Sequence, residues 1–111
     1  MGLFDRFKAR RRGNKKATSD LKYLREWASR RTGVEAFVEP ETRVTPMTVV
    51  LVAADGEWTR RPCGGAAGAR RVGELLGIPI YDVQKLGYPQ RMRDHDARLR
   101  IERRNASREE R

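Results

Sequence analysis

The sequence contains one cysteine and one histidine among its 111 residues, and it has no long apolar segment. Cys63 therefore cannot form a disulfide within the chain, and with His95 it cannot complete a common four-ligand zinc site. No apolar run approaches the roughly 18 to 20 residues that cross a bilayer, and residues 1–12 lack the apolar stretch of a secretory signal. These absences predict a cytoplasmic protein with no metal site and no disulfide partner.

Recognisable catalytic motifs are also missing. There is no second cysteine for dithiol chemistry, and Gly64, Gly65 and Gly68 do not follow the G-x-G-x-x-G order of a dinucleotide loop. Cys63 precedes an expected helix N-terminus, where a thiol pKa can fall, but Arg70 follows one residue too late for a phosphatase loop. The sequence therefore favours an inert, partly buried Cys63 in a protein that is not an enzyme and needs no cofactor.

Positive charge is concentrated at the two ends of the chain. The whole sequence has 25 Lys and Arg against 15 Asp and Glu, which gives a formal net charge of +10. Residues 1–16 hold seven basic side chains and one acid, residues 20–89 hold ten and nine, and residues 91–111 hold eight and five, so these segments carry +6, +1 and +3. A nearly neutral body with basic arms is typical of proteins that bind nucleic acids or anionic lipid surfaces.

Two amphipathic helices are expected in the body, which we place at residues 18–90. The first begins at a cap within residues 18–20 and ends near Arg31, because Leu21, Leu24 and Trp27 repeat at helical spacing. The second follows the glycines after Cys63 and directs Val72, Leu75 and Leu76 inward until Gly77 ends it. Both helices have an apolar stripe that must pack on something.

Three strands are expected between these helices. Residues 34–39 alternate between apolar and acidic or aromatic side chains, and residues 47–54 form the most apolar and β-branched run of the chain. Asp55 and Gly56 predict a hairpin turn into a third strand at residues 57–61. We therefore predict an α+β fold: a mostly antiparallel sheet of three to four strands with two helices packed on one face, in the order α-β-β-β-α-β.

Two interpretations remain open for residues 78–84. Ile78, Ile80 and Val83 suit a fourth strand, which a narrow sheet needs. Alternatively, residues 71–88 have the spacing of a helix-turn-helix, in which Tyr81, Gln84 and Lys85 would face the DNA major groove. Residues 91–111 are charged almost throughout and predict a solvated helix or tail.

Residues 1–17 predict a basic amphipathic arm that we expect to be disordered until it meets a partner. Leu3, Phe4 and Phe7 lie at helical spacing among cations, a combination that surface-bound membrane helices use. Three interpretations stay open for the arm: an unstructured tail, a contact to nucleic acid or the ribosome, and a peripheral contact to the inner face of the membrane.

The leading hypothesis is a non-enzymatic accessory protein that binds the phosphates of RNA, the ribosome or DNA. The candidate anion-binding residues are basic side chains of the arm and two Arg pairs of the body: Arg10, Arg11, Arg12, Lys15, Lys16, Arg60, Arg61, Arg70 and Arg71. The alternative is a membrane-associated protein anchored by Leu3, Phe4 and Phe7, and an enzyme that uses Cys63 ranks third.

Three segments carry a resemblance to a known family: GVEAFVEPETRVTP, VVLVAADGEWTRR and GIPIYDVQKLGYPQRMRDHD. Together with the residues between them, from Asp20 to Arg93, they resemble a family of small, uncharacterised actinobacterial proteins. The resemblance implies no activity, ligand or catalytic residue. Some relatives have a loose oxidoreductase label, which we treat as a minor alternative because this chain has neither a dinucleotide motif nor a dithiol.

Overall fold

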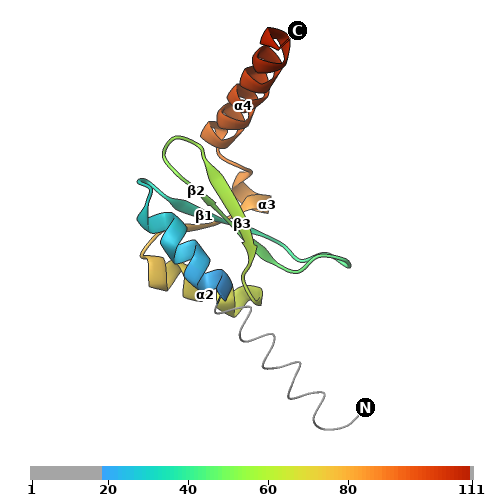
Figure 1. Ribbon diagram of the computed structural model, residues 1–111. Helices are drawn as coiled ribbons and strands as arrows, with labels where there is room; N and C mark the ends of the chain where they lie inside the picture. Colours follow the sequence, from blue (N-terminus) through green and yellow to red (C-terminus); the bar gives the residue numbers. More distant parts are fainter. Residues whose placement is uncertain (1–18, 111) are drawn as a thin grey trace, which may run out of the picture.

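The structure is a computed structural model that describes residues 19–110 (Figure 1). A first helix includes residues 19–29, and three strands follow it: β1, Glu35–Glu39; β2, Thr48–Val52; and β3, Trp58–Pro62. The chain then forms α2, Gly65–Leu76; β4, Ile80–Asp82; a single helical turn, α3, Val83–Leu86; and the long helix α4, Gln90–Glu109. This order confirms the predicted α+β class and its α-β-β-β-α-β arrangement.

The four strands form one mixed sheet in the order β3-β2-β1-β4. β1 pairs with β2 and β2 pairs with β3, both in antiparallel orientation, and the second pairing is the hairpin that Asp55 and Gly56 predict. β4 pairs with β1 in parallel, with Ala36 opposite Ile80. A parallel neighbour requires a crossover connection, and α2 provides it by leading the chain from β3 to the opposite edge of the sheet.

The helix-turn-helix alternative for residues 71–88 is wrong. After α2 the chain extends into β4, and the helix that follows, α3, has only four residues. Gly73 allows a close approach of a strand instead of a helix, since a Cβ atom there would lie 2.3 Å from Cδ1 of Ile80. Tyr81 lies on the sheet, with its ring centroid 5.4 Å from that of Phe37.

One face of the sheet is covered by the first helix and α2. Leu24 and Trp27 of the first helix and Val72 of α2 pack against Val49 and Leu51 of β2. Leu24, Val49 and Leu51 are at most 1% exposed. Leu24, Trp27 and Val72 therefore lie in this core as the helical spacing predicts, and Leu76 packs against it. The prediction for Leu75 is wrong: its side chain is 48% exposed, because Ala69, Val72 and Leu76 form the side of α2 that faces the sheet.

The opposite face of the sheet is also buried, although no helix was expected there. Phe37 of β1 and Val50 of β2 pack with Met92 of α4, and half-buried Tyr88 lies against this cluster. The alternation in β1 accounts for both faces, since Ala36 enters the first core and Phe37 the second. The start of α4 is therefore part of the folded body.

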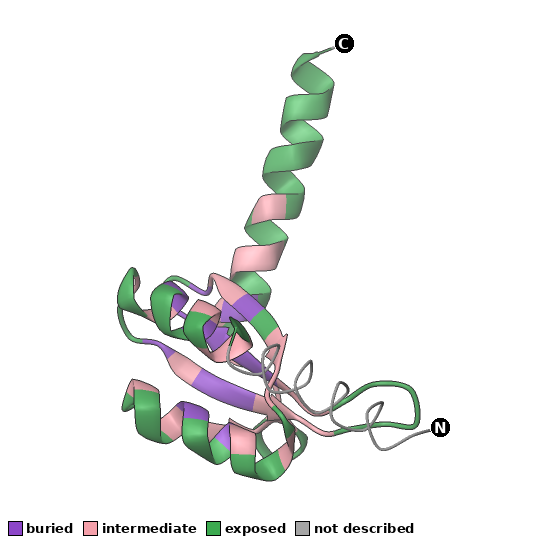
Figure 2. Ribbon diagram, turned by 60° about the horizontal axis from the view of Figure 1, so that its bottom comes forward, coloured by how far each residue is buried: buried purple, intermediate pink, exposed green. Residues whose placement is uncertain are grey.

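Helix α4 is held at the hairpin between β2 and β3. Nε of Arg91 donates a hydrogen bond of 2.9 Å to the carbonyl oxygen of Ala53. Gly56 in the turn has a φ of 92°, and a Cβ atom on it would lie 2.0 Å from the carbonyl oxygen of Arg91. From residue 100 onward every described residue is exposed, and α4 projects away from the sheet (Figure 2). We call residues 100–109 the outer half of α4.

Candidate nucleic-acid interface

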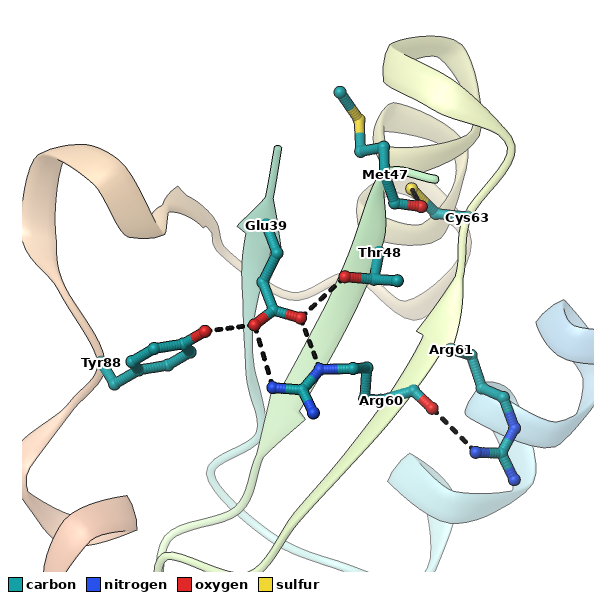
Figure 3. A network of polar contacts seen from close by, with 7 residues as sticks. All are labelled: Glu39, Met47, Thr48, Arg60, Arg61, Cys63 and Tyr88. Carbon is teal, nitrogen blue, oxygen red and sulfur yellow. Dashed lines mark hydrogen bonds and ion pairs between the residues drawn. The ribbon is translucent and has the colours of Figure 1, made fainter. Parts of the chain in front are cut away.

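Arg60, one of the predicted anion-binding residues, is bound to a carboxylate of its own fold (Figure 3). Its Nε donates to Oε1 of Glu39 at 2.5 Å and its Nη2 donates to Oε2 at 2.9 Å. The hydroxyl of Thr48 donates to Oε1 at 2.7 Å, and the hydroxyl of Tyr88 donates to Oε2. Such a two-pronged ion pair leaves little of this guanidinium for an external phosphate.

The environment of Glu39 holds this carboxylate in its charged form. Burial acts to raise the pKa of Glu39, but the hydrogen bonds from Arg60, Tyr88 and Thr48 outweigh burial and lower the pKa to about 2. Burial, and then the hydrogen bond to Glu39, raise the pKa of Tyr88. Because β1, β2, β3 and the segment before α4 each contribute one residue, the network ties four parts of the fold together.

Arg61 points to the opposite face of the sheet, where it contacts the first helix. Its guanidinium lies 3.9 Å from the ring centroid of Tyr23 and 4.0 Å from the carboxylate of Asp20. The hydroxyls of Tyr23 and Thr59 are joined by a hydrogen bond of 2.9 Å. The structure therefore separates Arg60 and Arg61 by the alternation of β3 and does not bring them together as one anion site.

Two further arginines near the ends of strands also have internal partners. Nη2 of Arg31 lies 2.7 Å from Oε1 of Glu57, and its guanidinium lies 4.0 Å from the ring centroid of Trp27. The hydrogen bond from Arg31 lowers the pKa of Glu57 despite the opposing effect of burial. Arg91 lies 2.8 Å from the carboxylate of Glu35. The arginines near the sheet thus connect elements of the fold.

Arg70 and Arg71 lie next to each other on α2, and both are exposed. Arg70 borders an open hollow of about 410 Å³ whose other lining residues include Met47 and Ile80. Glu74 follows these arginines at spacings of four and three residues, so an acid shares their side of the helix. This pair remains available to an anion, but its local charge is partly balanced.

Cys63 lies before α2, where a helix N-terminus could favour a thiolate, but its surroundings act in the opposite direction. Burial raises the pKa of Cys63, which outweighs the effect of the hydrogen bonds around it. Its Sγ lies 3.6 Å from the carbonyl oxygen of Met47 (Figure 3) and 3.5 Å from that of Gly65, and its thiol hydrogen can be donated to either oxygen. A thiol with a raised pKa is a poor nucleophile at neutral pH.

The basic residues of the N-terminal arm, Arg10, Arg11, Arg12, Lys15 and Lys16, lie outside the described residues, as do Leu3, Phe4 and Phe7. Within residues 19–110, no group of three or more His, Cys, Asp or Glu side chains is placed to hold a metal ion. In the same part of the chain, no helix combines the length and the apolar character needed to cross a membrane.

The long helix α4 carries arginines that the sequence analysis did not single out. Arg93, Arg100, Arg104 and Arg108 follow one another at spacings of seven, four and four residues, which places them within an arc of about 80° on one side of a helix. All four are exposed, and none of them forms an ion pair with another described residue. We call these four residues the arginine stripe.

The three outer arginines of the stripe, Arg100, Arg104 and Arg108, lie beyond the part of α4 that contacts the body. Arg91, Met92 and Arg98, which contact the sheet or the hairpin, lie on the other side of the helix, whereas Asp96 contacts the sheet from the side of Arg93 and Arg100. Asp96 is the one acid at helical spacing from Arg93 and Arg100, and its Oδ1 accepts a hydrogen bond of 2.9 Å from Nε1 of Trp58. The spacing of the stripe was present in the sequence, but only the fold shows which side of the helix is free.

Comparisons with known proteins found no matching family model, no match among curated proteins and no match among solved structures. The resemblance to actinobacterial proteins therefore stays a prediction.

Proposed function

We propose that this protein is a non-enzymatic, cytoplasmic accessory protein that binds nucleic-acid or ribosomal phosphates through its basic arms. The observation that carries the proposal is the arginine stripe. Arg31, Arg60, Arg61 and Arg91 have internal carboxylate partners, whereas the stripe consists of exposed guanidinium groups on a helix that projects from the body. A guanidinium offers a planar pair of donors that matches a phosphate.

The stripe carries an energetic cost that an anionic partner would offset. Arg100, Arg104 and Arg108 are spaced by four residues, and like charges at this spacing destabilise a helix by roughly 0.2 to 0.5 kcal/mol per pair. The outer half of α4 has no packing against the body that compensates for this repulsion. Bound phosphates would convert the repulsion into attraction, which favours a nucleic-acid partner.

Within the proposal, the N-terminal arm supplies a second cationic contact and Arg70 and Arg71 a weaker one. Arg60 and Arg61 take no part, because Glu39, Asp20 and Tyr23 already use them. The raised pKa of Cys63 supports a non-enzymatic protein over an enzyme that uses this thiol. No described residue favours membrane anchoring, so we retain it as an outcome of the test.

The proposal is tested by capture of the full-length protein from native lysate with and without nuclease, followed by binding of purified RNA and DNA at increasing salt. We expect nucleic acid to be recovered and the affinity to fall steeply with salt, because each neutralised phosphate releases a counterion. A variant with Arg10, Arg11, Arg12, Lys15 and Lys16 changed to Gln should bind more weakly. Sedimentation with anionic vesicles, together with no binding to nucleic acid, would support the membrane alternative.

A further inference from the structure

The outer half of α4 has the dimensions of a helix that enters a nucleic-acid groove. An α-helix with its side chains is about 10 to 12 Å across, and the major groove of B-form DNA is about 12 Å wide. Figure 2 shows this half of α4 clear of the sheet, with exposed residues along its length. Since the body contacts only the first half of α4, the outer half can enter a groove without a collision between sheet and DNA.

The side of α4 that would face the groove has suitable chemistry. At about 1.5 Å per residue, Arg100, Arg104 and Arg108 extend over about 12 Å of the outer half. The residues on the same side of the helix include Ala97 and Ser107, whose short side chains allow the helix backbone to approach closely. Glu102 and Glu109 lie on the opposite side of the helix, where they would face solvent.

Other partners fit the observations less well. Single strands are bound by exposed aromatic side chains that stack on bases, but every described aromatic residue is buried or half-buried: Tyr23, Trp27, Phe37, Trp58, Tyr81 and Tyr88. Duplex RNA has a major groove too narrow for a helix. A second copy of α4 lacks an apolar seam to pair with, because Leu99 and Ile101 point to opposite sides of the helix.

We propose that the outer half of α4 binds in the major groove of duplex DNA, with Arg100, Arg104 and Arg108 on the phosphates that border the groove. This inference rests on the proposed function and names the polymer and the binding element. It assigns the duplex contact to the C-terminal helix, and it leaves the N-terminal arm as a second, independent contact to the backbone.

The test compares two full-length variants that each lose three positive charges. One is Arg100→Gln with Arg104→Gln and Arg108→Gln. The control is Arg25→Gln with Arg30→Gln and Arg43→Gln, three exposed arginines without an ion-pair partner among the described residues. Fluorescence anisotropy measures binding to a DNA duplex of about two helical turns, to the RNA duplex of the same sequence and to the single DNA strand.

We expect the wild type to prefer the DNA duplex and the stripe variant to lose about tenfold or more in affinity, while the control changes by about twofold or less. The slope of log affinity against log salt should fall by about 2.7 in the stripe variant, since each lost phosphate contact contributes about 0.9. Methyl green, which occupies the major groove, should compete with the protein, and netropsin in the minor groove should not. A stripe variant with Lys in place of Gln should recover most of the affinity.

The results separate this inference from the proposed function. Equal losses in the two Gln variants, or equal binding to the RNA duplex and the single strand, would overturn the groove assignment while nucleic-acid binding stands. Failure of the wild type to bind any nucleic acid would overturn both proposals. Circular dichroism of each variant shows whether the helix is retained, and the Lys variant keeps the test decisive if the Gln substitutions alter helicity.

Discussion

Strand β3 and the outer half of α4 both carry arginines close together in the sequence, but these arginines have different surroundings in the fold. On β3, Arg60 is held by Glu39 and Arg61 lies between Asp20 and Tyr23. In the outer half of α4, Arg100 and Arg104 have no described carboxylate partner. The comparison teaches that a cluster of positive charge in a sequence becomes a candidate binding surface only where the fold provides no internal carboxylate for it.

The largest expected difference between the two regions is in packing. Leu51→Ala removes a side chain that is 0% exposed and should reduce the free energy of unfolding by about 2 to 5 kcal/mol. Ile101→Ala in the outer half of α4, where the side chain is 47% exposed, should change it by about 0.5 kcal/mol or less. Urea unfolding of both variants measures this, and a comparable loss for Ile101→Ala would show that the outer half is packed.

The docking of α4 on the hairpin is the next largest effect. In Gly56→Ala the new Cβ atom would meet the carbonyl oxygen of Arg91 at 2.0 Å, so we expect a loss of about 2 to 4 kcal/mol. Gly64→Ala is the matched control, since Gly64 also has a positive φ, 78°, but no neighbour within 4 Å. The Gly64→Ala substitution should lower the free energy of unfolding by about 1 to 2 kcal/mol. If thermal unfolding shows equal losses of stability for the two variants, backbone strain at the positive φ, and not the contact with α4, determines the effect of a side chain at residue 56.

The network around Glu39 makes the stability of the body sensitive to acid. The pKa of Glu39 is about 2 in the folded protein against an ordinary value of 4.5, so its contribution is present above pH 4.5 and is lost as the pH falls toward 2. Glu39→Gln should cost about 1 to 3 kcal/mol at neutral pH and flatten this part of the stability profile. Urea unfolding from pH 6 to 2 checks it, and an unchanged acid slope in Glu39→Gln would assign the effect to other carboxylates.

The smallest expected effect on stability comes from the arginine stripe. Changing Arg100, Arg104 and Arg108 to Gln should raise the free energy of unfolding by about 1 kcal/mol or less, because these side chains contact nothing in the body and the variant removes only their mutual repulsion. On the same helix, Arg91→Gln should cost about 1 to 3 kcal/mol, since Arg91 binds Glu35 and the carbonyl oxygen of Ala53. Similar losses in chemical unfolding would contradict the distinction between structural and free arginines.

Much of the architecture could be predicted from local patterns. The helical spacing of Leu24 and Trp27, the alternation around Phe37 and the turn at Gly56 each correspond to an element of the structure. Residues 78–84 could not be decided in the same way, because Ile80 fits a strand and a helix equally well by spacing alone. Residues 80–82 form a strand because they pair in parallel with β1. This pairing joins residues that are distant in the sequence, so local spacing does not reveal it.

The candidate site was predicted less well than the fold. Arg60 with Arg61 and Arg70 with Arg71 are adjacent pairs in the sequence, but neighbours on a strand point to opposite faces. Arg60 and Arg61 each have a carboxylate partner within the fold, and Glu74 lies at helical spacing from Arg70 and Arg71. The stripe on α4 is visible as a spacing in the sequence, yet many charged helices have such a spacing without a free face.

The sequence by itself determined where the charge lies along the chain, the first helix, α2 and the three antiparallel strands, and most side chains of the first core, because these properties depend on composition and on spacing within one element. Only the tertiary structure decided which arginines are free. The ion pair of Arg60 with Glu39 joins residues 21 positions apart through the register of three strands. The exposure of the arginine stripe follows from how the first turns of α4 dock on the hairpin, and local spacing contains neither relation.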